Sequence, residues 1–175
     1  MDQDLTPFRP SKLWRRMPLE QRIDAAGLFW ADEQSADQQL EAVGALATHM
    51  KFRPRSVLSL ADDRKARYLA ALPTISDAVA ARALVNYHLA RRRAMMAAFL
   101  DALGIPHDDG LIAEETVPKP DAGKLKQASA ELADRFPPAD VALYLSTLVS
   151  QDPETWGDLI DLPQTQGAAS TSSSA

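Results

Sequence analysis

Apolar positions recur along most of this chain with a period close to that of the α-helix. Side chains three and four positions apart share one helix face, and this spacing joins Leu40, Val43 and Ala47. Proline, serine and glycine interrupt the pattern where helices commonly begin or end. The pattern predicts helices over residues 18–31, 35–50, 59–72, 76–93, 124–136 and 139–150, with a short one at 153–156.

Two segments between these helices are open to interpretation. Nothing between Ser76 and Gly104 breaks the helical pattern, so the helix from Ser76 either ends near Arg93 or continues. Residues 51–59 are interpreted as a loop, because a proline at position 54 disfavours helical geometry in the residue before it.

The composition strengthens the helical interpretation. The chain has 30 Ala and 22 Leu but only 7 Val and 5 Ile. Ala and Leu lose little conformational freedom in a helix, whereas β-branched side chains lose more. We therefore predict an all-α fold, a compact bundle of about six or seven short helices, with no sheet.

The length of 175 residues fits one domain with a substantial core. We predict a single helical domain over residues 1–162. A proline-containing hinge at 116–123 would let the C-terminal helices at 124–161 pack back onto the first part. Residues 163–175 have no large apolar side chain, and we predict a disordered tail there.

Some classes of function are excluded by what the sequence lacks. It has no cysteine, so disulfides, thiolate metal sites and cysteine nucleophiles are absent. Its longest fully apolar run is seven residues, "AMMAAFL", far short of a membrane span. The first ten residues have acids but no apolar core, unlike a secretory signal. We expect a cytoplasmic protein that does not bind a membrane.

Charge is unevenly distributed along the chain. The net charge is −5 overall, but residues 51–93 carry ten bases and three acids. The segments on either side are acidic, with residues 94–175 at net −9. A basic middle between acidic flanks indicates an anionic partner, or flanks that cover the middle.

The stretch "LPTISDAVAARAL" contains the one local motif of interest. Leu72, Pro73, Ile75 and Ala80 match positions of the helix-hairpin-helix element of DNA-binding proteins, which this stretch resembles. Both glycines of that motif are replaced here, by a threonine and a serine.

The resemblance implies that the hairpin's backbone N–H groups would hold phosphate oxygens without reading bases. The residues implied or placed nearby are Thr74, Ser76, Lys51, Arg53 and Arg55. A joint of this shape also arises simply to turn a chain between two helices, so a structural corner stays the alternative.

An apolar run after the three consecutive arginines at 91–93 is a candidate surface for a partner. Met95, Met96 and Phe99 could line a groove for a helix of another protein, because methionine adapts to varied surfaces. The alternative is that these side chains belong to the core.

The loop "HDDG" offers a weak candidate for a metal site. His107, Asp108 and Asp109 combine an imidazole with two carboxylates. No standard ligand spacing is met, and Asp109 followed by glycine is equally typical of a turn. Motifs for a nucleophile, a phosphate-cradling glycine loop or a dinucleotide site do not occur, so we predict no catalytic residues and no cofactor.

Three functions follow from the sequence. The first is a non-catalytic interaction or regulatory protein that binds a protein partner through residues 95–103 or the basic loop at 51–55. The second is nucleic-acid binding through the hairpin and the basic segment at 51–93. The third is a metal-assisted enzyme centred on His107.

Overall fold

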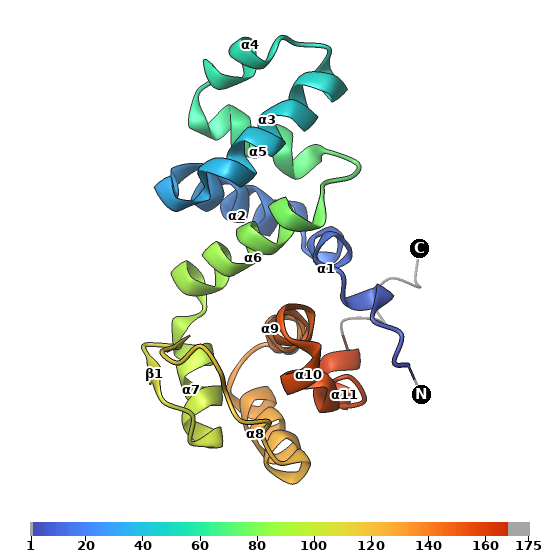
Figure 1. The fold of residues 1–175 in the computed structure, drawn as a ribbon, viewed down its shortest axis with the longest axis vertical. Helices are drawn as coiled ribbons and strands as arrows, with labels where there is room; N and C mark the ends of the chain where they lie inside the picture. Colours follow the sequence, from blue (N-terminus) through green and yellow to red (C-terminus); the bar gives the residue numbers. More distant parts are fainter. Residues whose placement is uncertain (1, 168–175) are drawn as a thin grey trace. The chain divides into compact units, whose positions relative to one another are not determined.

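The computed structural model describes residues 2–167 and shows a predominantly helical protein (Figure 1). Within these residues there are eleven α-helices, three short 3-10 helices and one two-stranded sheet. The all-α class is therefore confirmed in outline. The expected number of helices was too low and a sheet was not expected.

The chain divides into two compact units. Unit 2 comprises Pro10–Ala90, and unit 1 joins the residues up to Arg9 with those from Arg91 onward. The single domain predicted over residues 1–162, with its hinge at 116–123, stays a prediction.

Unit 2 is built entirely from helices. In order they are α1 (Pro10–Arg16), α2 (Leu19–Ala31), η2 (Glu33–Ser35), α3 (Ala36–Met50), α4 (Pro54–Leu58), α5 (Asp62–Ala71) and α6 (Asp77–Arg91). Helix α2 packs mainly against α5, and α4 packs against α3. The largest fully buried side chains here are Leu13, Trp14, Phe29, Leu46, Leu69 and Leu84.

Unit 1 surrounds one central helix. Its elements are η1 (Thr6–Phe8), α7 (Arg93–Leu103), β1 (His107–Asp108), β2 (Leu111–Ile112), α8 (Ala122–Arg135), α9 (Pro138–Gln151), α10 (Pro153–Trp156), η3 (Gly157–Leu159) and α11 (Pro163–Gln166). Every residue of α9 from Val141 to Val149 is buried. Helices α8, α10 and α11 and the two 3-10 helices pack around it.

The sheet is a minimal antiparallel hairpin that pairs His107 with Ile112 and Asp108 with Leu111. Its two-residue turn places Asp109 and Gly110 at φ of 48° and 91°. Asp-Gly is a favoured pair where both turn residues need positive φ. The expectation of no sheet overlooked this signal and treated the segment as a plain turn.

Several helix boundaries differ from the expected ones for local reasons. Pro54 begins α4 inside the segment interpreted as a loop, because proline is tolerated at the first helical position. Arg92 is non-helical and separates α6 from α7. The tail predicted from residue 163 begins with α11, in which Thr165 is buried. Residues 168–175 lie outside the described part of the chain.

None of the helices within residues 2–167 is both long and apolar enough to cross a lipid bilayer.

Candidate functional site

Nine of the ten bases of residues 51–93 fall into two groups, and the tenth, Arg91, has an interaction of its own. Four form ion pairs with acids: Lys65 with Asp62 at 3.1 Å, Arg82 with Asp32 at 3.0 Å, Arg92 with Asp140 at 3.3 Å and Arg93 with Asp109 at 3.5 Å. A second group is exposed and has no ion pair within residues 2–167: Lys51, Arg53, Arg55, Arg64 and Arg67. The second group is available to a charged partner.

The first two members of that group, Lys51 and Arg53, lie in a short turn between α3 and α4, and Arg55 follows in α4 itself. Lys51 ends α3 in the left-handed conformation, with φ of 56°. The next N–H, of Phe52, donates to the carbonyl oxygen of Ala47 at 3.0 Å, which satisfies an otherwise unpaired helix carbonyl. Arg53 is extended and Pro54 begins α4. This turn directs the chain away from α3 without burying Phe52.

Helix α4 has one inward residue, Val57, which is fully buried. Arg55 and Leu58 are three positions apart, so they are neighbours on the helix surface, and both are exposed. Phe52 is 45 % exposed and Leu58 is 54 % exposed. We call Lys51, Phe52, Arg53, Arg55 and Leu58 the 51–58 surface.

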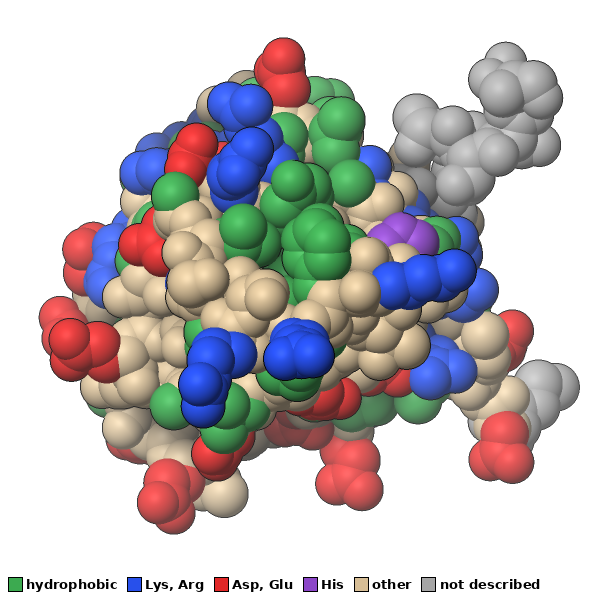
Figure 2. Space-filling view, turned by 90° about the horizontal axis from the view of Figure 1, so that it is seen from above, with side chains coloured by type: hydrophobic (Ala, Val, Ile, Leu, Met, Phe, Trp, Pro, Cys, Tyr) green, Lys and Arg blue, Asp and Glu red, His purple; other side chains and the backbone are tan. Residues whose placement is uncertain are grey.

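Figure 2 looks onto unit 2 from above and shows hydrophobic side chains in the middle of this face with Lys and Arg side chains around them. Acidic side chains lie mostly towards the margins of the view. The first acids that follow in the chain, Asp62 and Asp63, belong to α5. Exposed aromatic residues and arginines are the types enriched at protein interfaces.

The hairpin at 72–77 serves as a corner between α5 and α6. Ser76 accepts a hydrogen bond from the N–H of Val79 at 3.2 Å through its side-chain oxygen, which caps α6. Asp77 accepts one from the N–H of Ser11 at 3.0 Å. Asp77 thereby places a carboxylate in the first turn of α6, where it reduces the attraction of the helix N-terminus for a phosphate.

A shallow groove of about 390 Å³ runs beside this hairpin. Gly44, Ala45, Thr48 and His49 line it from α3, opposite residues 72–74. Lys51, Arg53 and Arg55 are not among its lining residues. This groove therefore does not unite the predicted phosphate-binding residues, and that site stays a prediction.

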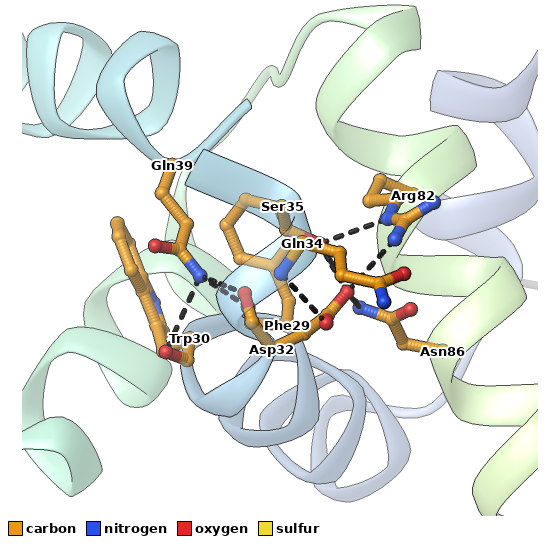
Figure 3. A network of polar contacts seen from close by, with 8 residues as sticks. All are labelled: Phe29, Trp30, Asp32, Gln34, Ser35, Gln39, Arg82 and Asn86. Atoms are coloured by element: carbon orange, nitrogen blue, oxygen red, sulfur yellow. Dashed lines mark hydrogen bonds and ion pairs between the residues drawn. The ribbon is translucent and has the colours of Figure 1, made fainter. Parts of the chain in front are cut away.

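The polar residues of α6 take part in a network that the sequence did not predict (Figure 3). The Ser35 hydroxyl donates to Asp32 at 2.5 Å and accepts from Nε of Arg82 at 2.8 Å. Arg82 also donates to Asp32, and Asn86 donates to the same carboxylate oxygen at 3.2 Å. The hydrogen bond from Ser35 lowers the pKa of Asp32 to about 2, aided by the Gln34 N–H and by Arg82.

Gln39 completes this network from the other side. Its amide donates to the carbonyl oxygens of Phe29, Trp30 and Asp32, at 2.9, 3.3 and 2.8 Å. These carbonyls lie at the C-terminal end of α2, where intrahelical partners run out. The network connects the α2–α3 junction to α6. Its one hydroxyl group, that of Ser35, already donates one hydrogen bond and accepts another, so we regard the network as structural.

The apolar candidates on α7 are buried. Met95, Met96 and Phe99 are 1 %, 9 % and 0 % exposed. Phe99 packs edge-on against Tyr144, with ring centroids 5.7 Å apart, and lies 6.1 Å from Trp156. Their burial favours the alternative that these side chains belong to the core of unit 1, and binding of a partner by them stays a prediction.

His107 also has partners for both ring nitrogens. Nε2 lies 2.7 Å from an Asp101 carboxylate oxygen, and Nδ1 accepts the N–H of Gly110 at 2.9 Å. Asp109 pairs with Arg93. Across the described residues, no group of three or more His, Cys, Asp or Glu side chains is placed to hold a metal ion. The candidate His107, Asp108 and Asp109 are thus elements of a hairpin attached to α7.

A second groove, of about 360 Å³, lies in unit 1 among residues 103–124. Two of its polar residues have structural partners: Asp121 caps α8, and Lys119 pairs with Asp158 at 3.4 Å. Glu114 and Lys124 complete its charged lining. This lining supplies no hydroxyl or imidazole beside a base, which nucleophilic catalysis requires.

Comparison of the chain with protein-family models, curated proteins and solved structures gives no match.

Proposed function

We propose that this protein is a non-catalytic interaction protein that binds a negatively charged macromolecular partner through the 51–58 surface. One observation carries the proposal: Lys51, Arg53 and Arg55 are exposed without an ion pair among the described residues, and they flank the exposed Phe52 and Leu58. A protein partner is the preferred class, and a cytoplasmic location stays a prediction from the sequence.

The chemistry of this surface suits binding. Each exposed ion pair contributes only about 0–1 kcal/mol, but grouped bases attract an acidic partner from a distance and orient it. The apolar side chains then add affinity when the partner covers them. The surface therefore combines electrostatic attraction with apolar burial in one place.

Binding by the hairpin at 72–77 has less support, because the Asp77 carboxylate in the first turn of α6 opposes an anion and Ser76 already caps the helix. The metal-assisted enzyme has no cluster of ligands among residues 2–167 to support it. Among the regions predicted from the sequence, the basic loop at 51–55 offers several exposed charged side chains that form no ion pair within the described residues.

The proposal is tested with two labelled polyanions, a short poly-L-glutamate and an oligothymidylate, by fluorescence anisotropy. We expect at least one to bind at low salt and to weaken as salt is added. The double variant R53E/R55E should lose about tenfold or more in affinity.

A matched control carries the same change in charge elsewhere. Lys12 and Lys126 are exposed on α1 and α8, and K12E/K126E should bind nearly as well as the unmodified protein. Circular dichroism checks that both variants remain helical. Equal losses in the two variants, or no binding of either probe, would overturn the proposal.

A further inference from the structure

Resting on the proposed function, we infer the kind of partner: the 51–58 surface binds an acidic peptide segment that carries large apolar side chains. The segment belongs to another protein, and nucleic acid is the competing class. Three features of the surface carry this inference.

The first feature is the pair of apolar residues. A single-stranded nucleic acid stacks its bases on aromatic side chains, so it would use Phe52 and leave Leu58 without a partner. A peptide with leucine or aromatic side chains packs against both. Leu58 is 54 % exposed and Phe52 is 45 % exposed, so both have substantial area to cover.

The second feature is the way charge and apolar groups alternate. Phe52 lies between Lys51 and Arg53 in the chain, and Arg55 is a helical neighbour of Leu58. The long stems of lysine and arginine can also pack against apolar groups while their charged ends stay in water. A complementary segment needs carboxylates close to its apolar side chains, which a phosphate backbone does not provide.

The third feature is the charge of the whole chain. Its net charge is −5, and residues 94–175 alone carry −9. Affinity for nucleic acid depends on neutralising many phosphates, and a protein of net negative charge is poorly suited to that. A short acidic segment needs only the few bases that the surface supplies.

The test compares three labelled probes of equal charge: a glutamate-rich peptide with leucine and phenylalanine interspersed, the same peptide with serine at those apolar positions, and an oligothymidylate. Fluorescence anisotropy gives each dissociation constant. We expect the acidic–apolar peptide to bind about tenfold or more tightly than the serine version.

Variants then assign the gain to the apolar residues. F52A/L58A should reduce the affinity for the acidic–apolar peptide to that of the serine version and leave the serine version itself unchanged. Leu40 and Leu111 are exposed to a similar degree elsewhere, at 65 % and 50 %, so L40A/L111A is the matched control and should bind as the unmodified protein does.

The outcomes separate this inference from the proposed function. The inference is overturned if the two peptides bind equally well. It is also overturned if the oligothymidylate binds more tightly than the peptides and R53E/R55E abolishes that binding. The proposed function is kept in both cases. Failure of all three probes overturns both. A loss in L40A/L111A as large as in F52A/L58A also overturns the inference, because the effect would not be local.

Discussion

Phe99 on α7 and Phe52 after α3 are the same residue type in opposite surroundings. Phe99 is fully buried between Tyr144 and Trp156. Phe52 is 45 % exposed and lies between two exposed bases. The comparison teaches that an apolar residue indicates a partner only when the rest of the chain leaves it uncovered. Helix α7 has its partners within unit 1, and the 51–58 surface has none among the described residues.

Arginines of unit 2 show the same division. Arg82 donates to Ser35 and Asp32, and its own chain uses its hydrogen-bonding capacity. Arg53 and Arg55 are exposed and form no ion pair within residues 2–167. A paired, half-buried arginine stabilises a fold, whereas an exposed and unpaired one contributes little to stability and keeps its charge available.

The prediction with the largest expected effect on stability concerns the two phenylalanines. F99A should lower the free energy of unfolding by about 3–5 kcal/mol, because it leaves a cavity among packed rings. F52A should change it by less than about 0.5 kcal/mol. Chemical denaturation followed by circular dichroism measures both. A small effect of F99A would mean that the α7 face is not core.

The next effect concerns the two kinds of arginine. R82A should destabilise the protein by about 2 kcal/mol, because Asp32 and Ser35 lose a donor in half-buried surroundings. R55A serves as the control and should stay within about 0.5 kcal/mol of the unmodified protein. If R55A costs as much as R82A in the same denaturation experiment, the division of the bases into two groups is wrong.

A smaller effect distinguishes the hairpin at 72–77 from the 51–58 surface. S76A should cost about 1 kcal/mol, because α6 loses its cap, whereas S76D should be close to neutral, because aspartate caps equally well. Neither change should alter the binding of poly-L-glutamate. Weaker binding in S76D, with stability preserved, would show instead that the hairpin takes part in anion binding.

The last effect is a dependence of stability on pH that appears only in acid, and it sharpens the account of Asp32. Its pKa is lowered from 3.8 to about 2, so the stability that its ionised form provides is complete above 3.8 and is lost as the pH falls through about 2. Denaturation midpoints of the unmodified protein and of D32N should therefore converge over this interval. Midpoints that stay a constant distance apart would contradict the role given to the carboxylate.

Much of the helical structure could be predicted because its signals are local. The Ala- and Leu-rich composition and the spacing of apolar residues indicate helices, and Ser76, where the pattern predicted that a helix begins, caps α6. The boundary between α6 and α7 had no such local signal. Nothing in the sequence between Ser76 and Gly104 breaks the helical pattern, yet Arg92 is non-helical in the structure.

The candidate site could be predicted only in part. Lys51, Arg53 and Arg55 are recognisable as a basic loop, but their neighbours Phe52 and Leu58 were not singled out. Pro54 was taken to exclude a helix, so the arrangement of Arg55 and Leu58 on one side of α4 was missed. The signal that could have revealed it was a proline suited to the first helical position, followed three residues later by the apolar Val57.

The sequence by itself determined that this protein is helical, and that its bases are concentrated in its middle, because helix preference and charge belong to individual residues and their near neighbours. Only the tertiary structure decided which apolar faces are covered and which basic side chains form ion pairs with acidic ones. Those outcomes depend on residues as distant in the chain as Asp32 and Arg82, or Phe99 and Tyr144, and folding brings them together.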